Sequence, residues 1–242
     1  MKNQYFGDIN DYRKYGLLRA IIHASRLKLL VVWMLTPDDG STDGKFISYL
    51  EKTDKWAHHD PELFHGIKGL LKNSTKRNVA LIERTAFLPG AVYFSDYVPD
   101  RSVDRESWFN LLLRASRESD IVFLDPDNGM EVKSVPYGRK KSSKYLFWRE
   151  LETLWSDGKS LLIYQHFPRV KRDVYIRRMI SMFGKYAIGS YIGVFKTSRV
   201  AFFLLLQPKH RQHYDAIMNS LHDKWNVRGG IQIYIMNMTG SG

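Results

Sequence analysis

The chain has 242 residues, enough for one α/β domain with a sizeable core, and a net charge of +12 from 37 Lys and Arg against 25 Asp and Glu. It contains no cysteine, which excludes a disulfide scaffold, a thiolate zinc site and a cysteine nucleophile, and fits a reducing, cytoplasmic compartment. The longest apolar runs, 29–35 and 200–206, are too short to cross a bilayer, and we expect neither a secretion signal nor a membrane partner. A basic excess of this size favours a polyanion, so the expected partner is nucleic acid, RNA or DNA.

Helices and strands are predicted in alternation over the first two thirds of the chain. Apolar residues at helical spacing predict a helix over 11–27 with Asp11 as a possible N-cap, and the run 29–35 predicts a strand buried on both faces. A turn rich in Gly, Pro and Asp follows. Further strands are expected at 78–83, 92–97, 120–124 and 160–164, and further helices at 45–73 (in pieces, broken near Asp60-Pro61), 107–117 and 144–156.

The last third predicts a basic helix over 170–183, a late pair of strands at 188–195 and 201–206, a helix over 209–225 and a final strand at 231–236. The alternation indicates an α/β fold, with a doubly wound, mainly parallel Rossmann-like sheet and helices on both faces. We expect a single domain over 1–239, in which 1–28 is an N-terminal helical extension and 29–239 the Rossmann-like core. Residues 240–242, Gly-Ser-Gly, are set aside as a tail left from expression.

Ligands of such sheets bind outside the carboxyl ends of the strands. The loops that follow Leu35, Glu83, Leu124 and Tyr164 are therefore expected to converge on one rim. The sheet should bring Asp125 and His166 to that rim together, since each follows or ends a predicted strand.

The sharpest local signal is the apolar strand 120–124 running straight into Asp125-Pro126-Asp127-Asn128-Gly129. Proline fixes one backbone angle and the polar residues tolerate turn geometry, so the segment is a good turn sequence anywhere. Its position after the strand best placed to be central favours a functional interpretation, in which the strand delivers a carboxylate to the rim.

Segment 121–128 resembles a divergent form of the Asp-Pro-Pro-Tyr or Asn-Pro-Pro-Tyr motif of S-adenosylmethionine-dependent amino-methyltransferases that act on adenine or cytosine in nucleic acids. The layout also resembles the bacterial large-subunit ribosomal RNA adenine-N6 methyltransferase family. There, an N-terminal helix with an Asp and a Lys precedes the first strand, and residues 7–15, which include Lys14, are similar to it. Residues 33–40 are similar to its cofactor loop, and 158–168 to its aromatic-proline turn.

This resemblance implies methyl transfer from S-adenosylmethionine to an exocyclic amine of a base. The Asp125 carboxylate and the Pro126 carbonyl would accept the two N–H bonds of the amine and so localise its lone pair. Asn128 stands where the family has an aromatic residue that stacks on the flipped base, and Tyr137 or Tyr145 could substitute. The catalytic set implied in this way is Asp125, Pro126, Asp127, Asn128, His166 and Lys14. The cofactor-binding set is Thr36, Asp38, Gly40, Gly44, Glu83 and Asp96.

Two alternatives remain open. Asp125 and Asp127, followed by Glu131 and Lys133, are similar to the arrangement in which nucleases and other phosphodiester hydrolases hold magnesium and position a water. Against this alternative, a Glu-x-Lys motif should lie on its own strand, and the gap after Asp125 leaves little room for one. The second alternative is a nucleic-acid-binding module without catalysis.

Two basic stretches could grip phosphates beside the rim. The first, 137–145, follows the Asp125 turn and mixes cations, hydroxyls and aromatic rings. The second follows His166, which could act as a general base, contact a phosphate or simply be a hydrogen-bonded rim residue. The nucleic-acid-binding residues predicted from these stretches are Arg139, Lys140, Lys141, Lys144, Tyr145, Arg169, Lys171 and Arg172.

Overall fold

The computed structural model describes residues 1–40, 44, 46–226 and 230–234. Within them, a seven-stranded sheet has the order β2-β1-β3-β6-β8-β7-β9, and a separate short pair joins β4 and β5. The strands are β1 (Leu29–Val32), β2 (Val92–Phe94), β3 (Ile121–Leu124), β4 (Gly129–Met130), β5 (Tyr145–Leu146), β6 (Ser160–His166), β7 (Tyr191–Lys196), β8 (Val200–Leu206) and β9 (Gln232–Ile233).

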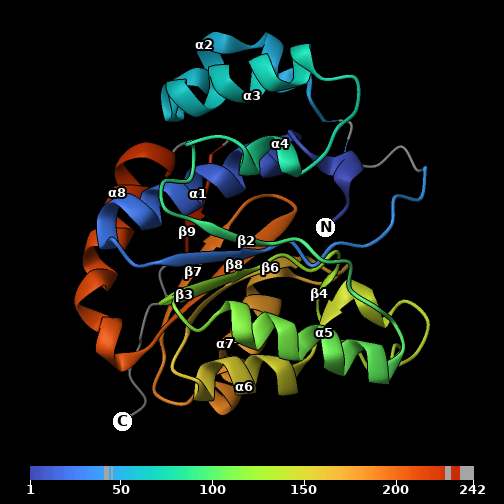
Figure 1. Ribbon diagram of the computed structural model, residues 1–242. Coiled ribbons are helices and arrows are strands. Elements are labelled where there is room, and N and C mark those ends of the chain that lie inside the picture. Colours follow the sequence, from blue (N-terminus) through green and yellow to red (C-terminus); the bar gives the residue numbers. More distant parts are fainter. Residues whose placement is uncertain (41–43, 45, 227–229, 235–242) are drawn as a thin grey trace.

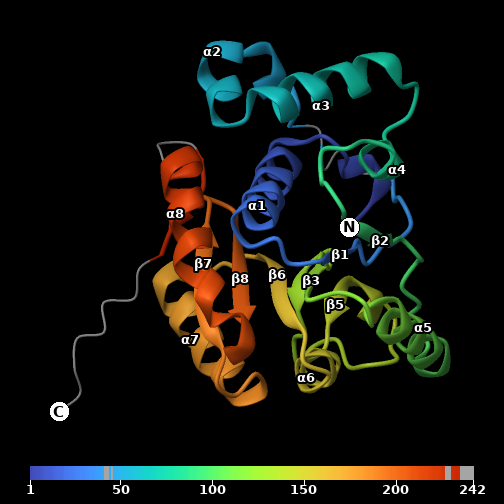
Figure 2. The same ribbon diagram turned by 60° about the vertical axis from the view of Figure 1, so that its left-hand side comes forward.

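Helices cover both faces of this sheet (Figures 1 and 2). One face carries α1 (Ile9–Ser25), α8 (Tyr214–Trp225) and α4 (Ala80–Glu83), with α2 (Thr53–Trp56) and α3 (Pro61–Asn73) as a cap above them. The opposite face carries α5 (Ser102–Ala115), α6 (Trp148–Ser156) and α7 (Arg172–Tyr186). Short 3-10 turns are formed by Asn3–Tyr5, Ser48–Glu51, Ala57–His59, Ser142–Lys144 and Pro208–His213.

The four strands β2, β1, β3 and β6 are parallel, and the predicted late pair forms an antiparallel hairpin, β7–β8, beside β6. The Rossmann-like α/β prediction is confirmed, with the parallel part confined to these neighbouring strands. Because β3 and β6 pair in parallel, with Leu124 opposite Ile163, their carboxyl ends meet at one rim. The prediction that Asp125 and His166 share that rim is also confirmed.

The core follows the alternation of side chains along the buried strands. Val31 and Phe123 face α1 and α8, whereas Val32 and Leu124 face α5 and α6. Helix α1 comes so close to α8 that a Cβ atom on Gly16 would lie 1.9 Å from the Trp225 ring, which explains the glycine inside a helix. The N-terminal helix is thus packed into the same core as the sheet.

One predicted strand was wrong. Residues 78–83 contain the short helix α4, in which Val79 and Ile82 are buried three residues apart and the Asn78 side chain accepts from the backbone N of Ala80. Several helix starts also differ, among them those of α5, at Ser102, and α8, at Tyr214. The N-cap of α1 is Asp8, not Asp11, and the helix expected at 144–156 begins at Trp148 because Tyr145–Leu146 pairs with β4. No helix in the described ranges combines the length and apolar character needed to cross a membrane. The predicted strand residues 235–236 and the tail 240–242 lie outside the described residues.

Candidate active site at the carboxyl ends of β3 and β6

The turn after β3 is held between its two neighbouring strands. The backbone N of Asp125 donates to the Val32 carbonyl of β1 at 3.0 Å. On the other side, the buried Gln165 side chain of β6 accepts from the backbone N of Met130 at 2.8 Å and donates to the Asn128 carbonyl at 3.2 Å. Gly129 has φ +105, and a Cβ atom there would lie 2.3 Å from the Gln165 amide. The glycine therefore permits both the backbone angle and this close clamp.

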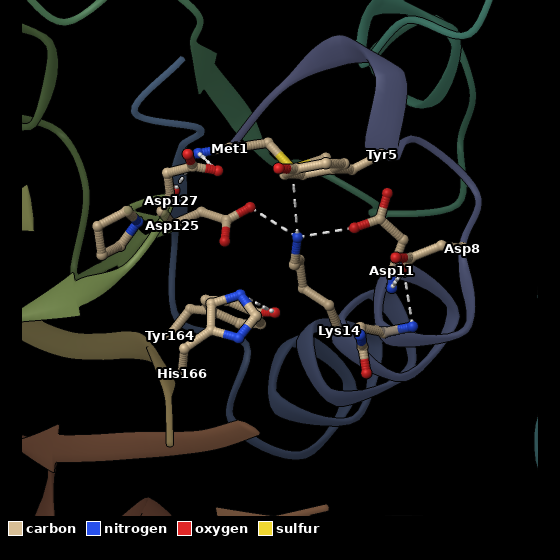
Figure 3. Close-up of a pocket in the computed structure, with 11 residues that line it drawn as sticks. Met1, Tyr5, Asp8, Asp11, Lys14, Asp125, Asp127, Tyr164 and His166 are labelled. Atoms are coloured by element: carbon tan, nitrogen blue, oxygen red, sulfur yellow. Dashed lines mark hydrogen bonds and ion pairs between the residues drawn. The ribbon is translucent and has the colours of Figure 1, made fainter. Parts of the chain in front are cut away.

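Lys14 connects the first helix to this turn (Figure 3). Its Nζ atom donates to Asp125 Oδ2 at 2.6 Å and to Asp11 Oδ1 at 2.7 Å, and all three side chains are buried. Asp11 is held in turn by the Tyr15 hydroxyl and the Gly7 backbone N. The resemblance implied an N-terminal helix with an Asp and a Lys ahead of the first strand, and the structure brings Lys14 of that helix into contact with Asp125.

Burial and neighbouring opposite charges act against each other on the pKa values of Asp125 and Lys14. Burial raises the pKa of Asp125 above its ordinary value, although the Lys14 ammonium opposes the rise. For Lys14, burial acts to lower the pKa, but the charges and hydrogen bonds of Asp11 and Asp125 raise it above its ordinary value, so the ammonium form is kept. Burial and the charge of Asp11 raise the pKa of Asp8 to about 7, despite the two backbone N–H groups that its N-cap carboxylate accepts.

Asp127 is the second carboxylate of the turn and is also buried. Its Oδ2 atom lies 3.3 Å from Lys144 Nζ and 3.9 Å from Lys2 Nζ. Its Oδ1 atom has no hydrogen-bond partner among the described residues, with the Met1 amino nitrogen at 3.9 Å. A buried acceptor without a donor is costly, so Oδ1 is suited to receive an N–H or O–H from a bound molecule.

Tyr164 and His166, on one face of β6, close the site from the side opposite to α1. The Tyr164 ring lies 5.1 Å from Lys14 Nζ and packs edge-on against the His166 ring. Nε2 of His166 and the Tyr164 hydroxyl are 3.3 Å apart. Tyr164 is buried, whereas His166 is exposed, so the imidazole stands at the mouth of the site.

These residues surround two connected spaces. A polar pit of about 20 Å³, the size of one water, reaches Asp125, Pro126, Asp11 and Lys14. Outside it lies a cavity of about 340 Å³, called the central cavity below, within the range of small-molecule sites. Asp8, Asp127, Tyr164 and His166 line both spaces, and the central cavity is also lined by Lys2, Asp39, Gly44, Phe46, Asn128, Lys144 and Arg199.

The six predicted cofactor-binding residues are not gathered around one space. Gly44 lines the central cavity, whereas Gly40 is exposed. Thr36 is buried under the N-terminal segment, where its backbone N donates to the Met1 carbonyl, whereas Asp38 is exposed and accepts from Gln4 N. Two residues lie elsewhere: Glu83 accepts from Trp33 Nε1 and the Ser95 hydroxyl, and Asp96 is exposed beyond β2. Glu83 was expected at a strand end, and that local prediction fails with the strand.

The predicted nucleic-acid-binding residues divide into four places. Lys144 lines the central cavity, and Tyr145 lines an aromatic groove, defined by Tyr145, Trp148, Phe167, Tyr175 and Tyr186, between the Asp125 turn and α7. Arg169, Lys171 and Arg172 line a groove beside His166. Arg139, Lys140 and Lys141 are exposed on the loop before Ser142, where Asp100 accepts from the backbone N of Lys141.

The four residues of the nuclease alternative are separated. Asp125 and Asp127 face the polar pit, whereas Glu131 and Lys133 line the aromatic groove. Glu131 accepts from the backbone N of Trp148 at the start of α6. The described residues contain no group of three or more His, Asp or Glu side chains arranged to hold a metal ion.

Sequence reasoning missed several residues of the site. Asp8 and Asp11 were visible as acids ahead of Lys14, but their burial around the lysine depends on the tertiary fold. Arg77 was not singled out at all, yet its guanidinium donates to the carbonyls of Tyr5, Phe6 and Gly44 and so fixes the N-terminal segment over the rim. Arg199, from the β7–β8 turn, lines the central cavity and carried no local signal.

Comparisons with known proteins assign no family. No protein-family model and no curated protein matches the chain. Among solved structures, a crystal structure of human methyltransferase-like protein 13 in complex with SAH is similar over 87% of this chain and 90% of that chain, with 13% sequence identity and a TM-score of 0.31. A likeness this distant carries no argument about cofactor or substrate. Those questions depend on the site itself.

Proposed function

We propose that this protein transfers a methyl group from S-adenosylmethionine to an exocyclic amine of a base in RNA or DNA. The observation that carries the proposal is the contact of Lys14 with Asp125 at the carboxyl end of a central parallel strand. This contact brings together residues 7–15 and 121–128, two separate segments that each resemble part of a nucleic-acid amino-methyltransferase.

The turn offers acceptors for an amine. The lone pair of an exocyclic amine is delocalised into the ring, and acceptors for its N–H bonds localise it on nitrogen. In this proposal the Pro126 carbonyl and Asp127 Oδ1 accept the two N–H bonds, while Asp125, fixed by Lys14, holds the turn in place. Asp127 Oδ1 can also take the proton that leaves the nitrogen after transfer.

The central cavity fits a methylsulfonium donor in charge and size. Asp8, Asp39 and Asp127 line it together with Lys2, Lys144 and Arg199, so carboxylates are present to attract the positive sulfur and cations to face the carboxylate of the same donor. The rings of Tyr5, Phe46 and Tyr164 also line it and can face a cation. These residues would hold S-adenosylmethionine, which when bound supplies the methyl group. Of the six residues first assigned to the cofactor, this placement keeps only Gly44.

The substrate part of the proposal depends on charge. Lys144 at the cavity, the exposed cations of 139–141 and those of 169–172 flank the rim on two sides. Cations beside a cavity position a phosphate backbone without specifying a sequence. Tyr145, at the edge of the aromatic groove, is available to stack on a base.

Ligand binding tests the proposal most simply. Isothermal titration with S-adenosylmethionine should give a saturable heat, and the ligand should raise the melting temperature because it binds only the folded state. The variant Asp127→Asn should weaken the interaction, while Asp215→Asn, at an exposed side chain of α8, should leave it unchanged. Stabilisation by magnesium or manganese without any response to S-adenosylmethionine would favour the nuclease instead. Tight binding of nucleic acid with neither response would favour the binding module.

A further inference from the structure

Two grooves that contain several cations flank the mouth of the central cavity. The first, called the cap groove, has a volume of about 280 Å³ and lies between α1, the Ser48–Glu51 turn and α2; its cations are Arg13, Lys52, Lys55 and Arg199. The second, called the hairpin groove, has a volume of about 680 Å³ and follows β6; its cations are Arg169, Lys171, Arg172 and Arg199. Ser198 and Arg199 line both, so the β7–β8 turn joins the two grooves.

The two grooves differ from the central cavity in charge. No Asp or Glu is among the described residues that line either groove, whereas three carboxylates line the central cavity. Burial lowers the pKa of Arg13, and the charge of Arg199 acts in the same direction while Asp8 opposes it. Cations held near one another without intervening carboxylates repel, and a polyanion bound along the grooves would relieve that repulsion.

Aromatic rings accompany the cations. The Arg199 guanidinium lies 4.4 Å from the centre of the Phe46 ring, which is 49% exposed, and Arg172 lies 5.7 Å from that of Phe167. In the cap groove, Arg13 lies 5.3 Å from the ring of Trp56, which is buried, so the accessible ring that lines this groove is that of Phe46. Cations interleaved with accessible rings are typical of surfaces that bind single-stranded nucleic acid, where phosphates contact the cations and unpaired bases stack on the rings.

We propose that a single strand of nucleic acid lies along the cap groove and the hairpin groove, with Arg199 contacting the backbone between them, so that a base midway along the strand turns into the central cavity. This inference deepens the proposed function and depends on its substrate class, although not on methyl transfer. A single strand is favoured over a duplex because a base held in a duplex stack cannot reach an acceptor as buried as Asp127.

Fluorescence anisotropy with a labelled mixed-sequence oligonucleotide, as RNA and as DNA, tests the path. The double variant Arg199→Ala/Lys52→Ala removes one cation from the junction and one from the cap groove. It should weaken single-strand binding and flatten the plot of log affinity against log salt by about 1.4, since each phosphate contact contributes about 0.7 for a single strand. The single variant Arg199→Lys keeps the positive charge at the junction and should retain most of the salt slope of the parent protein.

The matched control is Arg114→Ala/Lys72→Ala, which removes the same charge from exposed positions on α5 and α3 outside both grooves. It should leave affinity and salt slope unchanged, and circular dichroism should show that both double variants fold. Equal slopes for the two double variants, or tighter binding of the annealed duplex than of the single strand, would overturn the proposed path. Loss of methyl transfer alone, with the slopes as expected, would overturn the proposed function and leave the path standing.

Discussion

Lys14 Nζ lies 2.6 Å from Asp125 Oδ2 in the protein interior, although 111 residues separate the two in the chain. The lysine comes from α1 and the carboxylate from the turn after β3, so the contact fixes the first helix against the strand whose loop forms the site. A second carboxylate, Asp11, contacts the same ammonium. Stability and site geometry therefore depend on one ion cluster.

Replacing Lys14 should destabilise the whole protein. Lys14→Met leaves Asp11 and Asp125 buried without their cation, and breaking a buried pair in this way costs about 3–5 kcal/mol. Urea unfolding measures the loss, with Lys28→Met, at an exposed lysine, as the control. If the two variants unfold at the same urea concentration, the cluster does not hold α1 against the sheet.

Asp8 should make stability depend on pH. Its folded pKa of about 7 lies above the ordinary value, so the folded state favours the protonated carboxyl. That contribution is complete below about pH 4 and is lost as the pH rises through 7. Asp8→Asn stays neutral and keeps an N-cap oxygen. Its free energy of unfolding should equal that of the parent protein near pH 4. Between pH 4 and pH 7 it should exceed the parent value by about 1.4 kcal/mol more for each pH unit.

Chemical denaturation of both proteins at a series of pH values provides the comparison, and taking their difference removes the titration of other groups. A difference in unfolding free energy that stays constant from pH 4 to pH 8 would show that Asp8 is ionised throughout.

The Gly129 clamp should be sensitive to one methyl group. Gly129→Ala meets both an unfavourable φ and the Gln165 amide, whereas Gly90→Ala meets a φ of +71 with no heavy atom within 4 Å. Both variants meet a positive φ that costs about 1–3 kcal/mol. The excess loss of melting temperature in Gly129→Ala therefore reports its contact with Gln165 together with a φ farther from the left-handed helical region. Equal losses would show that the side chain moves aside freely.

The basic loop 139–144 remains a prediction that binding can test. Lys140→Ala/Lys141→Ala should weaken binding to all sequences about equally and flatten the salt dependence by up to about 1.8, or 0.9 for each phosphate contact with duplex DNA. Anisotropy titrations over a range of salt measure it. Because both side chains are exposed, folding should be unaffected. An unchanged slope would show that the loop is a solvated turn.

The fold was predictable where the sequence pattern is local. The apolar runs of β3 and β6, buried on both faces, marked the strands, and the parallel arrangement placed Asp125 and His166 at one rim. Residues 78–83 misled because a short apolar stretch has the same appearance in a strand and in a single helical turn such as α4.

The candidate site was predictable only in part. The turn 125–129 and Lys14 were visible because a proline turn after a strand, and a resemblance, pointed to them. The joining of Arg199 to Phe46, or of Arg77 to the N-terminal segment, depends on contacts between segments far apart in the chain. The assignment of Glu83 to the cofactor relied on the strand expected at 78–83, and it fails because Glu83 accepts from Trp33 Nε1.

Methyl transfer itself tests the central claim most directly. Purified protein would be incubated with S-adenosylmethionine labelled in its methyl group and with single-stranded RNA or DNA, and the digested nucleosides analysed by mass spectrometry. We predict a methylated exocyclic amine with the parent protein and with Asp215→Asn. We predict a loss of about 100-fold or more with Asp127→Asn, which removes the carboxylate that accepts from the reacting amine, and with Asp125→Asn, which removes the charge by which Lys14 holds the turn. Oligonucleotide binding should be retained in both variants. The account would be contradicted if the folded protein bound both S-adenosylmethionine and nucleic acid but produced no methylated nucleoside.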